Sequence, residues 1–134
     1  MYILRKQLHF DAAHSLPQLG PNHKCAGLHG HTYTVEVVIL AQDRILNAQG
    51  MVVDFGKLSS LVDEWDHVNL NDVLSNDLPT VELLAKRLHD RIRELVNAST
   101  LQGEFHVWVT VHEGLGASVT FHAGDDFNYA FPPC

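Results

Sequence analysis

The stretch that most constrains the fold of this chain is residues 29–41, where His29-Gly30-His31 runs into a long alternating segment. Apolar side chains recur at every second position after His31, at Tyr33, Val35, Val37 and Ile39. Side chains of an extended strand point alternately to opposite faces, so both histidines share the face of these apolar residues. The segment therefore predicts a half-buried strand that carries two imidazoles at one end.

A third histidine, His14, follows another alternating run at residues 2–13, and a loop with two prolines leads from it to Cys25. Three histidines with one open position are the arrangement of a catalytic Zn²⁺ site. Cys25 could be the fourth ligand of a closed site or a reactive thiol beside Lys24. Ten histidines among 134 residues also produce close pairs by chance, so spacing alone leaves metal binding open.

The middle of the chain has the periodicity of helices. Asp54 is an N-cap candidate ahead of a first helix, and Thr80 is the N-cap candidate of a second. The apolar face of the first helix consists of Leu58, Leu61, Val62 and Trp65. The stripe of the second consists of Val81, Leu84, Ala85, Leu88, Ile92 and Leu95. The first helix is expected to end in the polar run at 66–72.

Two further alternating runs, 104–112 and 117–122, predict a hairpin that turns at 114–116. The order ββααββ predicts an α+β fold with a four-stranded antiparallel sheet and two helices on one face. Long open sheet edges favour pairing with copies of the same chain.

Length and composition exclude several classes of protein. The 134 residues fit a single domain over 1–134, and a net charge of −7 argues against nucleic acid as a partner. No apolar run has the length of a membrane span, and the first residues lack the apolar region of a signal peptide. The two cysteines, Cys25 and Cys134, do not suggest a disulfide framework. A cytoplasmic location without membrane contact is expected.

Two further features carry possible chemistry. Asp66-His67 is a carboxylate beside an imidazole, which can fix the tautomer of a general acid or base. Glu113 shares by parity the apolar face of the strand before it, where a carboxylate needs a partner or a pocket. A structural role on a polar strand face or a helix surface is assigned to the remaining strand and helix histidines: His9, His89, His106, His112 and His122.

Five fragments occur in one order along the chain: His14, residues 25–31, residues 66–71, residues 79–82 and Glu113. Together they resemble the 6-pyruvoyl-tetrahydropterin synthase family over residues 8–124. The three-residue gap between Cys25 and His29 resembles the bacterial branch that makes 6-carboxytetrahydropterin for queuosine. One departure is Gly114 after Glu113, where the family often has threonine.

The resemblance implies a role for eight residues. The implied zinc ligands are His14, His29 and His31. The implied catalytic residues are Cys25, Asp66 and His67. The implied ring-binding residues are Glu113 and Thr80. The resemblance also implies the tunnelling fold, in which subunits close an antiparallel barrel, commonly as a hexamer (a dimer of trimers), with active sites between subunits.

The implied activity is that of a zinc-dependent lyase. It would convert 7,8-dihydroneopterin triphosphate to 6-carboxytetrahydropterin, acetaldehyde and triphosphate. One alternative is 6-pyruvoyl-tetrahydropterin synthase, which eliminates triphosphate without breaking the carbon skeleton. An alternative of another class is a non-catalytic zinc-binding subunit in which Cys25 is the closing ligand.

Overall fold

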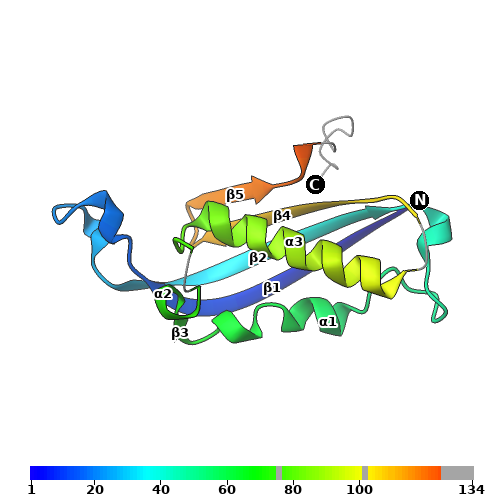
Figure 1. Ribbon diagram of the computed structural model, residues 1–134, viewed down its shortest axis with the longest axis horizontal. Helices are drawn as coiled ribbons and strands as arrows, with labels where there is room; N and C mark the ends of the chain where they lie inside the picture. Colours follow the sequence, from blue (N-terminus) through cyan, green and yellow to red (C-terminus); the bar gives the residue numbers. More distant parts are fainter. Residues whose placement is uncertain (75–76, 101–102, 125–134) are drawn as a thin grey trace.

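A computed structural model describes residues 1–74, 77–100 and 103–124, so Cys134 lies outside the described residues. A sheet with helices on one side forms the body of the molecule (Figure 1). The strands are β1 (Tyr2–His14), β2 (His29–Ala41), β3 (Val68–Asn69), β4 (Phe105–Glu113) and β5 (Ala117–Phe121). The helices are α1 (Phe55–Ser60), α2 (Leu70–Val73) and α3 (Val81–Ser99).

The strand order in the sheet is β3-β1-β2-β4-β5. The neighbours β1–β2, β2–β4 and β4–β5 are antiparallel, which confirms the predicted α+β fold and its four antiparallel strands. The short strand β3 is an addition that the sequence analysis did not predict. It pairs in parallel with β1, with Val68 beside Ala12 and Asn69 beside Ala13. A strand of two residues is too short to show alternation, so the polar run there indicated only the end of a helix.

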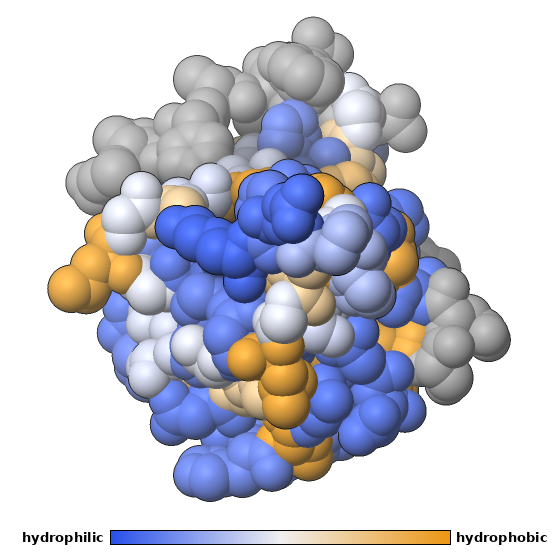
Figure 2. Space-filling model, turned by 90° about the vertical axis from the view of Figure 1, so that its left-hand side faces the viewer, coloured by the Kyte–Doolittle hydropathy of each residue, from blue (hydrophilic) through white to orange (hydrophobic). Residues whose placement is uncertain are grey.

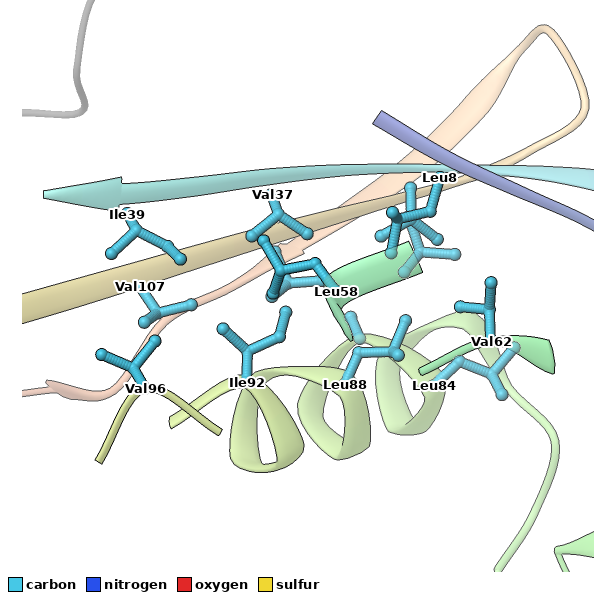
Figure 3. Packing of buried hydrophobic residues seen from close by; sticks show 14 of the residues in the cluster. Leu8, Val37, Ile39, Leu58, Val62, Leu84, Leu88, Ile92, Val96 and Val107 are labelled. Atoms are coloured by element: carbon cyan, nitrogen blue, oxygen red, sulfur yellow. The ribbon is translucent and has the colours of Figure 1, made fainter. Parts of the chain in front are cut away.

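The core lies between the inner face of the sheet and the helices. Leu8, Val37, Ile39 and Val107 point from the strands toward the side chains of α3 in Figure 3. The register pairs Leu8 of β1 with Val35 of β2, so the alternating apolar positions of both strands fall on this face. Burial of a large aliphatic side chain contributes about 1.5–3 kcal/mol. This shared apolar face therefore fixes which side of the hairpin the helices cover.

The first predicted helix is present but interrupted. Asp54 caps α1 by accepting a hydrogen bond from Gly56 N at 2.7 Å, as expected. The helix stops after Ser60, and a separate 3-10 turn covers Asp63–Trp65. The hydroxyls of Ser59 and Ser60 bond back to carbonyl oxygens four residues earlier, which competes with regular helix geometry. The predicted apolar positions Leu58, Val62 and Trp65 are nevertheless buried.

The second predicted helix, α3, begins as expected. Thr80 is its N-cap, with Oγ1 accepting from Leu83 N at 3.4 Å. Of its predicted stripe, Leu84, Ala85, Leu88 and Ile92 are buried, and Val81 and Leu95 are partly buried. Val96, which was not predicted, is buried as well. His89 does not lie on the helix surface as predicted, because its ring is buried against Phe121 of β5 at a centroid distance of 4.9 Å. No helix in the described ranges has both the length and the apolar character to cross a membrane.

Gly114 occupies the left-handed region with φ of 67°, at the turn between β4 and β5. This conformation favours glycine, because a residue with a Cβ rarely adopts it. We expect Gly114→Ala to lower the free energy of unfolding by about 1–2 kcal/mol, the cost of a left-handed L-residue. Urea denaturation measures this difference.

Gly116 is the matched control, because its φ lies outside the left-handed region and a Cβ there meets no atom within 4 Å. Gly116→Ala should change stability by no more than about 0.5 kcal/mol. Equal losses in the two variants would contradict the assignment of strain to Gly114.

Candidate metal centre and active site

Three histidines meet at the end of the β1–β2 hairpin. His14 ends β1 and pairs with His29, the first residue of β2, while His31 pairs with Ala12. Because side chains alternate between faces, all three lie on the face of the sheet that the helices cover. Their ligand nitrogens lie within 4.8 Å of one another, and the Nε2 atoms of His14 and His29 are 3.0 Å apart. The structure thus brings together the three predicted metal ligands.

Backbone carbonyl groups determine which ring nitrogen carries the proton. His14 Nδ1 donates to Pro79 O at 2.7 Å, and His29 Nδ1 donates to Gly27 O at 2.8 Å. A carbonyl oxygen only accepts, so in the neutral form of each ring the Nε2 atom presents its lone pair. His31 Nε2 is buried and makes no hydrogen bond to the described part of the chain. Converging acceptor nitrogens repel one another unless a cation lies among them, so this donor set fits Zn²⁺.

The surroundings of His31 favour its neutral form. Burial lowers the pKa of His31 most strongly; Glu113 opposes this, and His14 and His29 lower the pKa further. Neutral imidazole is the form that binds metals. Tyr33 is fully buried beside the cluster, with its hydroxyl 3.4 Å from His14 Nδ1. Burial, with a contribution from Glu113, raises the pKa of Tyr33 and keeps its hydroxyl protonated.

Glu113, the last residue of β4, reaches the same cluster. It pairs with Tyr33 of β2 and lies on the face of Val111, as its parity predicted. Glu113 Oε1 lies 3.3 Å from His31 Nε2, and Glu113 Oε2 lies 3.9 Å from His14 Nε2. An otherwise apolar strand face therefore ends in a carboxylate beside the histidines.

Asn71 of α2 holds the chain immediately after His14. Its side-chain oxygen accepts from Ser15 N at 2.8 Å, and its side-chain nitrogen donates to Ser15 O at 2.9 Å. Asn71 belongs to the motif at 66–71, but its position in the sequence predicts no role for its side chain. Asn71 and Ser15 are 56 positions apart in the sequence, so their contact could not be predicted from spacing. The pairing of β3 with β1 brings them together in the folded chain.

Thr80 directly follows Pro79, which contacts the histidine cluster. Pro79 is buried and supplies the carbonyl group that holds His14, so the start of α3 is tied to the histidine cluster. Thr80 Oγ1 itself is engaged in capping Leu83 N. Its ring-binding role stays a prediction.

Cys25 lies in the loop between β1 and β2, which projects beyond the helices at one end of the molecule (Figure 1). It is half-buried and free, and Leu16 N donates to Cys25 O at 2.8 Å, which ties the loop to the chain just after β1. Among the described residues, Cys25 belongs to neither group of clustered metal-ligating atoms. The structure therefore does not bring the thiol into the histidine cluster as a closing ligand.

Asp66 and His67 do form a pair, with Asp66 Oδ2 2.9 Å from His67 Nδ1. Asp66 Oδ1 also accepts from Asp11 N at 2.9 Å, and His67 N donates to Asp11 O at 2.6 Å. The hydrogen bond from Asp11 N, followed by that from His67, lowers the pKa of the Asp66 carboxyl. Asp66 therefore stays ionised at neutral pH and keeps the proton of His67 on Nδ1.

The pair lies on the other face of the sheet from the histidine cluster. Its metal-ligating atoms cluster with those of Asp11, whose Oδ1 accepts a hydrogen bond from Thr32 Oγ1 at 2.5 Å. Asp11 and Thr32 are the strand neighbours of Ala12 and His31, so their side chains point to the opposite face. A shallow hollow of about 570 Å³ there is lined by Asp11, Thr32 and His67, and His31 of the histidine cluster also contributes to its lining. Within one chain, the ligand atoms of the pair thus cluster with Asp11 and not with the three histidines.

The sheet order and the covering helices define a tunnelling-fold protein, here with a three-histidine centre at the end of its hairpin. The fold matches that of a 6-pyruvoyl tetrahydropterin synthase from Caenorhabditis elegans with a TM-score of 0.67 at 24% identity. The match covers 92% of this chain and 96% of that one. A protein from Wolinella succinogenes matches with a TM-score of 0.62 at 20% identity, covering 90% of this chain and 97% of that one.

The sequence profile of 6-pyruvoyl tetrahydropterin synthase matches residues 3–123, and the chain belongs to this family. A 6-carboxy-5,6,7,8-tetrahydropterin synthase from Bacillus subtilis is 37% identical over 67% of this chain and 64% of its own length. One from Synechocystis is 36% identical over 70% of this chain and 77% of its own length. A dihydroneopterin monophosphate aldolase from Pyrococcus furiosus is 35% identical over 74% of this chain and 82% of its own length.

Asn71 yields a prediction about the metal centre. Because Asn71 fixes the backbone directly after His14, Asn71→Ala should weaken zinc binding by about 10–100-fold, the usual cost of removing a group that orients a ligand. Competition with a chelator on the purified protein measures the affinity.

The control is Asn47→Ala, since Asn47 Oδ1 also accepts two backbone hydrogen bonds, from Gln49 N and Met51 N, in a turn elsewhere. This variant should lose stability yet keep zinc affinity. If both variants lost zinc affinity to the same extent, Asn71 would have no special role at the centre.

Proposed function

We propose that this protein is a zinc-dependent 6-carboxy-5,6,7,8-tetrahydropterin synthase that acts on 7,8-dihydroneopterin triphosphate and releases acetaldehyde and triphosphate. The observation that carries the proposal is the convergence of three Nε2 atoms with a carboxylate beside them, in a chain of this family. The names of the Bacillus subtilis and Synechocystis relatives support the choice of product.

His14, His29 and His31 would hold the zinc ion. Bound Zn²⁺ acts as a Lewis acid toward substrate oxygens, which makes an adjacent C–H bond more acidic. The hydrogen bonds from the rings of His14 and His29 to Pro79 O and Gly27 O orient both ligands before the metal arrives. The protein thus holds the rings of His14 and His29 in the orientation that metal binding requires.

Cys25, Asp66 and His67 would move protons. A thiolate at Cys25 is the proposed base, and its loop can bring it to the centre because the base of that loop adjoins His14. His67, with Nδ1 engaged by Asp66, has Nε2 available to accept or donate a proton. Its exposure on an open hollow suits a group that meets its substrate at the surface.

The separation of the two groups of ligand atoms supports an active site shared between subunits. Asp66–His67 of one copy would serve the histidines of another, in a homo-oligomer that we propose to be a hexamer. Hydrophobic patches lie among hydrophilic surface at the end of the molecule that carries the β1–β2 loop (Figure 2). Leu19 and Leu28 of this loop are exposed, and so is Leu115 in the β4–β5 turn. Contact between copies would cover such side chains.

Glu113 is the proposed anchor of the pterin ring. An amino-pyrimidinone presents two adjacent N–H donors, which a carboxylate can accept together. The low exposure of Glu113 strengthens such hydrogen bonds by excluding water. Thr80, at the capped start of α3, is proposed to help hold the ring.

Two other reactions are distinguished by their products. Elimination of triphosphate without carbon–carbon cleavage would indicate a 6-pyruvoyl-tetrahydropterin synthase. The similarity to the Pyrococcus furiosus protein favours, as a second candidate, an aldolase acting on dihydroneopterin monophosphate. A zinc subunit closed by Cys25 receives no support from the geometry, because the thiol lies outside the histidine cluster.

Mass spectrometry after incubation with the triphosphate tests the proposal. We expect 6-carboxytetrahydropterin together with acetaldehyde. An intact carbon skeleton, or turnover of the monophosphate alone, would refute the assignment in favour of one of the other two reactions.

The role of Cys25 is tested by replacement. Cys25→Ala should lower turnover by about 10²–10⁴-fold, the usual contribution of one acid–base group, and should keep the metal. Elemental analysis and product formation are measured on the same sample. His31→Ala serves as the comparison, because it should lose zinc. Loss of zinc from Cys25→Ala would instead identify a closed centre with a cysteine ligand.

A further inference from the structure

His67 has an unusual backbone conformation for a residue with a side chain. Its φ is 58°, and no other non-glycine residue in the described ranges has a positive φ. In this left-handed region the Cβ atom lies too close to a backbone carbonyl oxygen, so glycine is the residue that fits best. At Gly114, where φ is 67°, the chain does have glycine. At position 67 it has a histidine, whose side chain is 78% exposed and is not needed for the core.

Hydrogen bonds with the main chain of Asp11 explain how this conformation is maintained. His67 N donates to Asp11 O at 2.6 Å, and Asp11 N donates to Asp66 Oδ1 at 2.9 Å. The other oxygen of this carboxylate, Oδ2, lies 2.9 Å from His67 Nδ1. The main chain of one residue in β1 therefore contacts the backbone of His67 directly and its ring through Asp66.

Both main-chain groups of Asp11 are available for these contacts because of the strand register. Residues of an antiparallel pair alternate between exchanging two hydrogen bonds with the partner strand and exchanging none. The N–H and C=O groups of Asp11 both bond on the side of β1 where β3 pairs with Ala12 and Ala13. Thr32 of β2 fixes the side chain of Asp11, since its Oγ1 donates to Asp11 Oδ1 at 2.5 Å. The sheet thus gives residues 66 and 67 a fixed support.

A turn alone would not require a histidine at position 67. A left-handed residue at the entrance to β3 could be glycine, which adopts the conformation without strain. Strained residues persist only where their surroundings hold them, and they are concentrated at functional sites. His67 combines such a backbone with an exposed ring that a carboxylate orients. A requirement for this imidazole in this orientation explains the combination.

We propose that the main chain of Asp11 and the carboxylate of Asp66 hold His67 in a strained conformation that orients its imidazole, and that this strain lowers the stability of the fold. Asp11 is then a positioning residue, which acts through His67 and does not touch the substrate. The inference rests on the proposed function for the role of His67 in proton transfer. A ring held in place needs no rearrangement before the proton moves.

The first experiment compares glycine with alanine at position 67 in the full-length protein as purified. Both variants lose the ring and its contact with Asp66, so the difference between them reports on the backbone. Glycine is less stable than alanine in an ordinary strand or helix conformation, and the order reverses in the left-handed region. We expect His67→Gly to melt roughly 2–8 °C above His67→Ala. No substrate is needed.

His9 is the matched control. It is an exposed histidine of β1 whose ring also has a polar neighbour, with Nδ1 3.3 Å from Thr34 Oγ1. Its backbone is that of a strand, so His9→Gly should melt below His9→Ala. The inference would be overturned if alanine were as stable as glycine at position 67, or if glycine were the more stable residue at both positions.

The second experiment tests the contact between Asp11 and Asp66. Asp11→Pro removes the N–H donor and leaves the ladder with β2 intact, because this N–H bonds to Asp66. Asp11→Ala also lacks the carboxylate but keeps the donor, so it is the matched comparison. Nitrogen chemical shifts give the tautomer of the His67 ring. We expect the proton on Nδ1 in Asp11→Ala and a shift toward Nε2 in Asp11→Pro, which a purely structural role of Asp11 would not produce.

Turnover should follow the tautomer. We expect kcat to be about 10–100-fold lower in Asp11→Pro than in Asp11→Ala, with KM unchanged, because a misplaced catalytic group affects the chemical step. The remaining signals of the spectrum show whether the fold is intact. If Asp11→Pro does not fold, Asp66→Ala removes the same hydrogen bond from its acceptor side and should shift the tautomer in the same way. An unchanged tautomer in a folded variant would refute the positioning role.

The proposed function and this inference fail separately. If the predicted products do not form but glycine is the more stable residue at position 67 and the tautomer shifts, the reaction is wrong and the positioned ring stands. If the products form but alanine is the more stable residue, only the inference is wrong.

Discussion

The register of the β1–β2 hairpin is the constraint on which the rest of the structure depends. It pairs the whole of β1 with β2, from Tyr2 beside Ala41 to His14 beside His29. A slip of one residue would turn every side chain of one strand to the other face. The apolar core and the histidine cluster share a face, so the same burial that stabilises the fold also aligns the three imidazoles. The candidate metal site is thus an extension of the core rather than an addition to it.

Groups outside the two strands β1 and β2 complete the candidate metal site. Pro79 O at the start of α3 and Gly27 O in the loop each fix one imidazole, and the side chain of Asn71 fixes Ser15. The contacts of Pro79 and Asn71 join segments far apart in the sequence, and the pairing of β3 with the end of β1 places α2 beside Ser15. The position of α3 on the sheet is therefore coupled to the orientation of His14.

The sequence predicts the parts of this structure that follow from periodicity. The alternating runs gave the four antiparallel strands, and parity placed Glu113 on the inner face beside His31. What the sequence did not reveal depends on tertiary contacts. The two-residue strand β3 has no period of its own, and His89 is buried because β5 packs beside α3.

The candidate site shows the same division. The spacing of His14, His29 and His31 predicts that the three rings lie together, as they do in the structure. The adjacency of Asp66 and His67 in the sequence does not predict which face of the sheet they occupy. That face follows from hydrogen bonds to Asp11, which only the folded chain displays.

The place of His14 and His29 at the mouth of the β1–β2 loop has a consequence for the chain between them. The two residues are the last of one strand and the first of the next, so a metal held by both closes the loop at its base as a clip. Closing the base restricts the conformations that the loop can adopt in the folded chain. A metal at this position would limit the volume that Cys25 can sample. Metal content would thereby set the order of a loop that contributes none of the three nitrogen ligands.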